Sequence, residues 1–206
     1  MRVLLVTYEG MVKGEQKPFD KVTEENPLPV VVGTGELLKG LEEVLKDMKP
    51  GEEKTVELPP EKAFGERDPN KIAIIPLREF QKRNITPYPG LVIEADGMRG
   101  RVLSVSGGRV QVDFNHELAG KTVIYKVKVL KELKDPVEIA KAFFRRYFRR
   151  DAEEVKKVDE GIHVTYAPKN IEKDTMNKVL FVSRMLQFVP KVYITEVFER
   201  SKKAKK

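Results

Sequence analysis

The sequence predicts an α+β protein, and three observations lead to that class. Apolar residues recur at helical spacing on one face of a short segment, while Glu and Lys take its other face. The apolar positions are Leu37, Leu38, Leu41, Val44, Leu45 and Met48. Strand-like segments flank this helix at 3–9, 30–32, 54–58 and 123–130, and a second set of helical and strand patterns follows residue 134. We therefore expect an amphipathic helix packed on a sheet, with more α+β structure after it.

Composition limits the class of protein. A chain of 206 residues that is 40% hydrophobic and 34% charged is typical of a soluble globular protein with one or two domains. No apolar run is long enough to cross a membrane, and Met1–Val6 is too short for a signal-peptide core, so we place the protein in the cytoplasm with no membrane partner. The absence of cysteine excludes disulfides, thiolate catalysis and cysteine metal sites.

The positive charge is uneven along the chain. The net charge is +7, and residues 135–206 hold 17 Lys and Arg against 11 Asp and Glu, which is most of that excess. This asymmetry suggests a separate unit with its own partner, such as an acidic surface or RNA, although a solvated surface explains it as well.

The central helix has candidate boundaries. Thr34 or Gly35 is expected to cap its start, and Pro50-Gly51 to end it. After the strand at 54–58 comes a Pro-rich loop that ends in Ala63-Phe64-Gly65.

Residues 70–112 indicate a β-rich insertion. We expect a strand at 72–76, a short helix at 77–82, a strand at 90–95 and a hairpin at 101–114 that turns at Gly107-Gly108.

The remaining residues predict a basic α+β domain. Asp135-Pro136 is a cap followed by proline at the first helical position. A helix follows with aromatic residues at helical spacing; then come a strand at 162–166, a helix at 175–187 and a strand at 192–198. We expect the basic tail 200–206 to fray. A domain of about 70 residues is near the small end for independent stability, so we expect a homodimer through 135–206.

Conventional catalytic groups are scarce. His116 and His163 are the only histidines, and neither forms a convincing pair with a serine nucleophile or a metal site. His116 is expected to make a turn-stabilising hydrogen bond. Gly33-x-Gly35 lacks the Gly-Lys-Ser/Thr of a phosphate loop. We predict neither a metal nor a cofactor.

Several segments together are specific for one family. The run G-x-G-E-L-L-x-G-L-E-E from Gly33, the M-K-P-G-E from Met48 and the A-F-G around Phe64 resemble the FKBP-type peptidyl-prolyl isomerases. The GERDP that follows and the stretch DFNHELAGK at 113–121 are similar to the SlyD-type branch. Residues 135–206 resemble the extra carboxy-terminal domain of the longer archaeal members.

This resemblance implies a domain organisation. The isomerase domain would comprise 1–69 and 113–134, with an antiparallel sheet half-wrapped round the short helix. Residues 70–112 would form the insert-in-flap domain, which holds unfolded segments in SlyD-type proteins; a merely decorative β-insert is the alternative. Some SlyD relatives have a His- and Cys-rich tail, but this chain ends in Lys and Ala, so metal binding does not follow.

The resemblance also implies a peptide pocket. Leu38 would bind a peptide carbonyl through its backbone N–H, Asp20 would orient its neighbours, and Leu41 would form the floor. The implied catalytic residues are Tyr8, Phe19, Asp20, Leu38, Phe64 and Tyr125, and the implied substrate-binding residues are Val30, Leu37 and Leu41. Ordinary core packing is the competing interpretation of the apolar members, above all of Val30 and Leu41.

Two positions depart from many relatives. Many have tryptophan at the Leu41 position, although the SlyD branch commonly has leucine, so macrolide affinity is not carried over. Many have tyrosine at the Phe64 position; phenylalanine keeps the wall but lacks the hydroxyl donor, so we expect weaker peptide binding than in a tyrosine form.

The implied function is isomerisation of X–Pro bonds in unfolded or nascent proteins, with chaperone activity through the insertion. This reaction needs no nucleophile, because its barrier of roughly 18–20 kcal/mol is a rotation about the amide. Two alternatives belong to other classes: a non-enzymatic holdase that clamps peptides, and an RNA- or ribosome-associated module that uses the basic domain.

Overall fold

The computed structural model describes residues 1–95 and 97–198, so the basic tail at 200–206 lies outside the described residues. Contacts divide the chain into two units, which are described separately. Unit 1 comprises residues 1–11, 18–56 and 125 onward, and unit 2 comprises residues 12–17 and 57–124. The domain boundaries expected from the sequence remain predictions.

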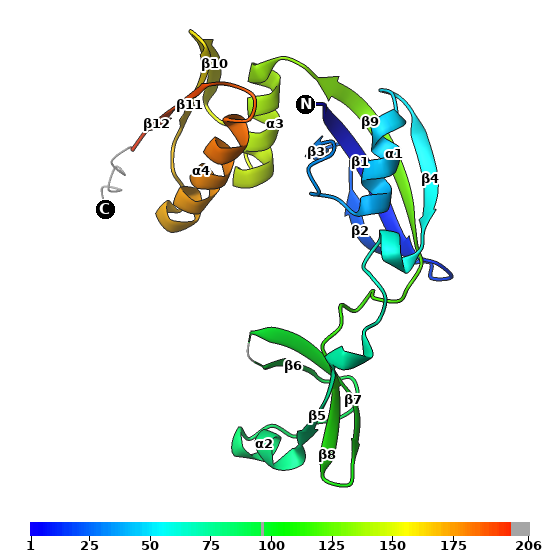
Figure 1. The fold of residues 1–206 in the computed structure, drawn as a ribbon. Coiled ribbons are helices and arrows are strands. Elements are labelled where there is room, and N and C mark those ends of the chain that lie inside the picture. Colours follow the sequence, from blue (N-terminus) through cyan, green and yellow to red (C-terminus); the bar gives the residue numbers. More distant parts are fainter. Residues whose placement is uncertain (96, 199–206) are drawn as a thin grey trace, which may run out of the picture. The chain divides into compact units, whose positions relative to one another are not determined.

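A five-stranded sheet underlies the first part of the chain. Its strands run in the order β2 (Pro18–Val22), β1 (Val3–Val12), β9 (Val123–Leu133) and β4 (Glu53–Leu58), while β3 (Leu28–Val31) also pairs with β1. Helix α1 (Lys39–Asp47) lies against this sheet (Figure 1). Leu45 and Met48 at its end join Leu4, Val6 and the β9 valines in a buried core. The amphipathic pattern is thus explained by burial of one helical face against the sheet.

Helix α1 begins later than the sequence suggested. Leu37 and Leu38 precede it, and neither Thr34 nor Gly35 caps it with a side chain. Gly33 and Gly35 have φ values of 88° and 75°, which keeps this segment out of the helical region. Instead of capping the helix, Gly35 donates its backbone N–H to the side chain of Glu42 in the first turn, at 2.7 Å.

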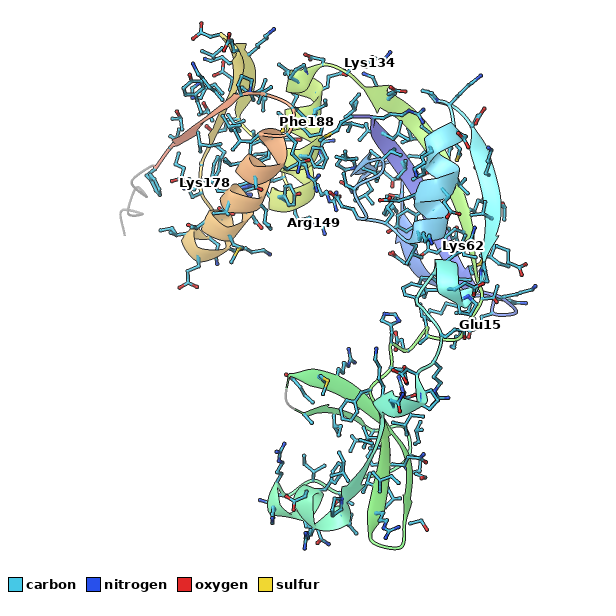
Figure 2. The ribbon with its side chains drawn as sticks, viewed as in Figure 1. Glu15, Lys62, Lys134, Arg149, Lys178 and Phe188 are labelled. Carbon is cyan, nitrogen blue, oxygen red and sulfur yellow. The ribbon has the colours of Figure 1, made fainter. Side chains whose placement is uncertain are left out.

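The last part of unit 1 is a three-stranded sheet with two helices. The strand order is β10 (Glu154–Val158), β11 (Gly161–Tyr166) and β12 (Lys191–Glu196), and β11 pairs in parallel with β12 across helix α4 (Ile171–Met185). Helix α3 (Pro136–Phe148) is capped as expected, because the Asp135 carboxylate accepts from the Glu138 N–H and Pro136 is at the first position. Arg149, which Figure 2 labels, ends this helix in a left-handed conformation.

The structure adds one strand that was not expected in this region and corrects two expectations. Strand β10 has the sequence EVKKV. Charged residues are common on edge strands, so the absence of an apolar run left this strand unpredicted. Helix α4 begins at Ile171, four residues early, because Asn170 caps it through the Lys173 N–H. Its expected apolar set is only partly buried, as Phe181 and Met185 face the core; Met176, Val179 and Leu186 are exposed.

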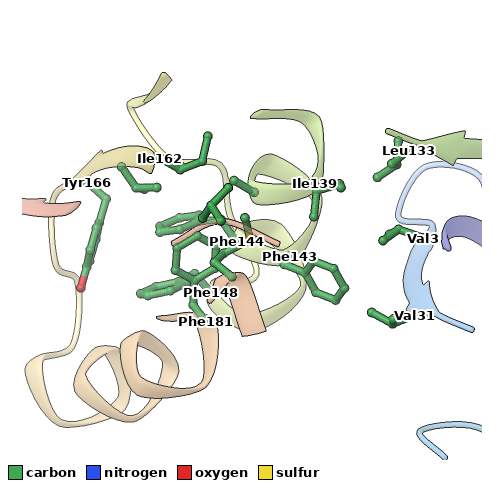
Figure 3. Close-up of a cluster of buried hydrophobic side chains, with 14 residues drawn as sticks. Val3, Val31, Leu133, Ile139, Phe143, Phe144, Phe148, Ile162, Tyr166 and Phe181 are labelled. Carbon is green, nitrogen blue, oxygen red and sulfur yellow. The ribbon is translucent and has the colours of Figure 1, made fainter. Parts of the chain in front are cut away.

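One buried cluster joins the two parts of unit 1. Val3, Val31 and Leu133 of the first sheet share it with the core of α3 and α4. Figure 3 shows Phe143 directed toward these three residues. Phe144 and Phe148 are also buried, so these α3 aromatic residues form a core stripe, as their helical spacing indicates.

Unit 2 contains a four-stranded sheet with one short helix. The strand order is β5 (Ile72–Pro76), β8 (Arg109–Asp113), β7 (Met98–Ser106) and β6 (Val92–Ala95), and all neighbours are antiparallel (Figure 1). Helix α2 (Leu77–Lys82) contributes Phe80 to a core with Val102, Val110 and Val112. The expected strand at 72–76, helix at 77–82 and turn at Gly107-Gly108 are confirmed. Two 3₁₀ turns, Pro60–Lys62 and Pro69–Lys71, precede this sheet.

Candidate peptide-binding site

The β1–β2 pairing brings the polar pair of the site together. Gly10 lies opposite Asp20, and Tyr8 lies opposite Val22. Tyr8 is therefore the diagonal neighbour of Asp20 on one face, a separation that a long aromatic side chain can span. The Tyr8 hydroxyl donates a hydrogen bond to Asp20 Oδ2 at 2.8 Å. Asp20 thus orients a neighbouring side chain, which is the role that the resemblance implied for it.

A bulge places Phe19 on the same face. Met11 pairs with Pro18 and Gly10 with Asp20, which leaves Phe19 as an extra residue on β2. Such a bulge re-aims a side chain that strict alternation would send to the other face. The Phe19 ring consequently meets Tyr125 of β9 edge-on, with ring centroids 5.8 Å apart. Tyr125 also meets Tyr8 edge-on at 5.6 Å. Edge-to-face pairs of this kind hold rings in fixed orientations.

Sequence reasoning missed Gly10, which makes this aromatic cluster possible. A Cβ at that position would lie 2.8 Å from Cε1 of Tyr125 and 3.0 Å from Cζ of Phe19. Both rings therefore rest on the bare backbone of β1. A glycine at the strand interior, two residues after an aromatic residue, was the available signal, since such a glycine marks a close approach.

Burial and charge keep both tyrosines protonated. Burial, followed by the hydrogen bond to Asp20 and the charge of its carboxylate, raises the pKa of Tyr8. Burial, and to a smaller extent the Asp20 charge, raises the pKa of Tyr125 to about 12. At neutral pH the cluster thus presents apolar ring surface and neutral phenol hydroxyls.

The helix side of the site has two kinds of residue. Val30 and Leu41 are buried, with 1% and 3% of their surface exposed, and Tyr125 is buried to a similar degree at 4%. Leu37 is half-buried and packs on the same cluster as Tyr8. Leu38 is the residue before α1, and its carbonyl accepts from the Glu42 N–H at 3.0 Å. Its own N–H belongs to the first turn, where amides have no partner within the helix.

Phe64 lies in unit 2, so the structure does not place it relative to the other site residues. Its ring stacks on His116 with centroids 4.7 Å apart and planes 4° from parallel. His116 Nδ1 accepts a hydrogen bond from the Leu118 N–H at 3.2 Å, which confirms its expected role in a turn.

Unit 1 also contains a pocket that is separate from the residues assigned to peptide binding. It has a volume of about 310 Å³ and is lined by Val22, the segment 26–29, and Arg145, Arg146 and Arg149 of α3. Sequence reasoning did not foresee it, because it forms between elements more than a hundred residues apart.

The described ranges 1–95 and 97–198 contain neither a metal-ligand cluster nor a membrane-spanning helix. No three His, Asp or Glu side chains gather there as a metal-binding group. None of the helices there is both long and apolar enough to span a bilayer.

Comparisons with known proteins agree with this arrangement. Residues 2–86 match the family model of FKBP-type peptidyl-prolyl cis-trans isomerases, and residues 73–118 match that of the FKBP26 IF domain. The short-type peptidyl-prolyl cis-trans isomerase of Methanocaldococcus jannaschii is 40% identical over 128 residues, 62% of this chain and 81% of that protein. The SlyD isomerase of Helicobacter pylori is 26% identical over 61% of this chain and 70% of its own.

Among solved structures, the three FKBP domains of wheat FKBP73 match 65% of this chain and 39% of that one, with 20% identity and a TM-score of 0.37. The sequence relatives carry the assignment. The chain covers 81% of an isomerase to which it is 40% identical, and its Tyr8–Asp20 pair lies beside the Phe19 and Tyr125 rings. It therefore belongs to the FKBP-type peptidyl-prolyl cis-trans isomerases and resembles their SlyD-type members.

Proposed function

We propose that this isomerase acts on X–Pro bonds of unfolded or nascent proteins in the cytoplasm, and that its insertion holds the same polypeptides as a chaperone. The observation that carries the first part is the cluster in which Tyr125 meets the Tyr8 and Phe19 rings and Asp20 fixes the Tyr8 hydroxyl. No covalent step is required.

The proposed chemistry follows from these groups. Apolar ring surface desolvates the amide and favours a twisted form in which nitrogen no longer conjugates with the carbonyl, an effect of roughly 1–5 kcal/mol. The Leu38 N–H would hold a neighbouring peptide carbonyl. A thousandfold acceleration requires about 4 kcal/mol, which is within that range.

Exposed apolar side chains on the inserted sheet and on the segment between α2 and β6 support the chaperone part. Ile74, Tyr88 and Met98 are 64%, 58% and 54% exposed, and Val92 is 38% exposed. Ile74 is adjacent to the core residue Ile75 and therefore faces the opposite side of the sheet. These exposed side chains would supply apolar contacts to unfolded segments.

A paired experiment separates the two activities. Cis/trans exchange of a short proline peptide is measured by NMR, and aggregation of an unfolded protein by light scattering. Phe19→Ala is expected to lose most of the exchange activity and to keep aggregation suppression. Ile74→Ser with Tyr88→Ala is expected to do the reverse, so each variant is the control for the other.

The holdase alternative makes a different prediction. If the wild-type protein suppresses aggregation but does not accelerate peptide exchange, the isomerase proposal fails and the aromatic cluster is a peptide clamp.

We also propose that two copies associate through 135–206. The support is the exposed apolar face of α4, where Ile171, Met176, Val179 and Leu186 are each at least 52% exposed. Sedimentation at micromolar concentration is expected to give twice the chain mass, and Met176→Glu with Val179→Glu to give one. A wild-type mass of one chain would exclude the dimer.

A further inference from the structure

Glu36 forms ion pairs with arginines of two helices that lie far from it in the sequence. Its Oε2 lies 2.9 Å from Nη1 of Arg146 on α3, and its Oε1 forms an ion pair with Arg184 on α4. The Glu36 side chain is 18% exposed and that of Arg184 is 13% exposed. Largely buried charges are costly unless paired, so loss of the Glu36 charge would leave two arginine charges uncompensated.

The cluster is attached to the segment that precedes α1. We define the Glu36 loop as residues 33–38, between β3 and α1. Gly33 and Gly35 adopt left-handed conformations, so neither helix nor sheet geometry dictates the path of this loop. Within it, Thr34 donates to the Val31 carbonyl at 2.9 Å and Gly35 donates to Glu42 at 2.7 Å. Glu36 provides the contact to the helices that follow residue 135.

The two arginines are themselves held in place. The Arg184 guanidinium lies over the Phe143 ring at 5.4 Å, and that of Arg146 lies over the same ring at 6.0 Å. Phe143 is fully buried in the cluster that includes Val3 and Val31. Arg146 also donates to the Pro29 carbonyl at 2.9 Å, next to Val30. The guanidiniums are thus preorganised by packing before they meet the carboxylate.

The loop leads directly to two residues of the candidate site. Leu37 packs on the same core as Tyr8, and Leu38 carries the N–H assigned to a peptide carbonyl. The positive charge of Arg146 also acts on Tyr8, where it opposes part of the rise in pKa caused by burial and Asp20. A shift of Glu36 would therefore displace the groups that contact substrate.

We propose that the segment after residue 135 is a working part of the isomerase: Arg146 and Arg184 are positioning residues that hold Glu36 and so place Leu37 and Leu38 for the peptide. This inference rests on the proposed isomerase function. It differs from an independent carboxy-terminal domain, whose loss or alteration would leave peptide exchange unchanged.

The first test uses uncharged replacements of similar shape. Glu36→Gln keeps side-chain length, and Arg184→Met keeps an unbranched apolar stem without the charge. Glu36→Gln alone leaves two arginines unpaired, whereas the double variant leaves only Arg146 unpaired. Each variant's kcat/KM for a short proline peptide is normalised to folded protein. We expect a loss of roughly tenfold, since a misplacement of about 1 Å can cost a hundredfold. The double variant should be no worse than the poorer single one, because the residues act through one contact.

Arg145 provides a matched control. It lies on α3 beside Arg146 but pairs with Asp151, at 2.8 Å, instead of Glu36. Arg145→Gln removes one positive charge from the same helix and is expected to leave kcat/KM unchanged. Equal losses in Arg145→Gln and Arg184→Met would overturn the proposal, because general electrostatics would then explain both.

A second readout does not depend on catalysis. The ¹H–¹⁵N resonance of the Leu38 amide is expected to shift in Glu36→Gln and Arg184→Met, and to stay in place in Arg145→Gln. If the folded variants retain both wild-type kinetics and the wild-type Leu38 resonance, the arginines are structural only and the inference fails. If the wild-type protein shows no exchange activity, the proposed function fails instead, while the resonance still tests the contact.

Discussion

Replacing Gly10 by alanine tests whether the aromatic cluster is the catalytic surface. The added Cβ would lie 2.8 and 2.9 Å from Cε1 and Cζ of Tyr125, and 3.0 Å from Cζ of Phe19. Carbon atoms pack best at roughly 3.5–4.0 Å, so the rings must retreat by about 0.7–1 Å. Gly10 has no positive φ, so the change introduces a steric conflict and no backbone strain.

The magnitude follows from that displacement. Overpacking of this kind costs roughly 1–3 kcal/mol of the free energy of unfolding. Tyr125 is only 4% exposed, so it cannot swing freely into solvent. A wall displaced by about 1 Å is expected to lower kcat/KM for peptide exchange by up to roughly a hundredfold. The assay is NMR exchange on a short proline peptide at a temperature where urea titration shows the variant to be folded.

Gly100 provides a steric control in unit 2. A Cβ there would lie 2.7 Å from Cε1 of Phe114 and 2.7 Å from Cγ1 of Val112, so Gly100→Ala imposes a similar conflict. We expect it to destabilise the inserted sheet and to leave exchange of a short peptide unchanged. The reasoning is refuted if folded Gly10→Ala keeps wild-type kcat/KM, or if Gly100→Ala loses as much.

Two further predictions concern pH and the base of the insertion. The pKa of Tyr125 is about 12 when folded and about 10 when unfolded, so its contribution to stability is complete below pH 10 and is lost between pH 10 and 12, by at most about 3 kcal/mol. The raised pKa of Tyr8 acts in the same direction, and urea unfolding from pH 9 to 12 should show a smaller decline for Tyr125→Phe than for wild type; parallel declines would contradict this. Asn115 accepts from the Asp68 N–H and donates to the Asp68 carbonyl, both at 2.9 Å, so Asn115→Ala should cost about 1–3 kcal/mol locally. Amide hydrogen exchange at Asp68 should accelerate, and an unchanged rate would show that water replaces the amide without loss.

The local pattern of the chain was sufficient for much of the architecture. Asp135-Pro136 begins α3, and the apolar segment at 72–76 forms β5 as expected. These features depend on neighbours within a few residues, where capping and side-chain periodicity act. The residue order around Leu37–Leu41 indicated the family through resemblance, which the comparisons confirmed.

The tertiary structure decided which residues meet. Gly10 is an ordinary strand glycine until the β1–β2 bulge brings Phe19 onto it and β9 brings Tyr125. The exposed face of α4 could not be told from a core stripe, because helical periodicity does not state how many faces are covered. Arg146 and Arg184 are at least 110 residues from Glu36 along the chain. A local sequence pattern does not predict contacts between residues so far apart. By itself the sequence determined most of the elements and the family. The packing of α3 and α4 against the first sheet determined the charge contacts that hold the Glu36 loop, because only folding sets the distance between remote charges.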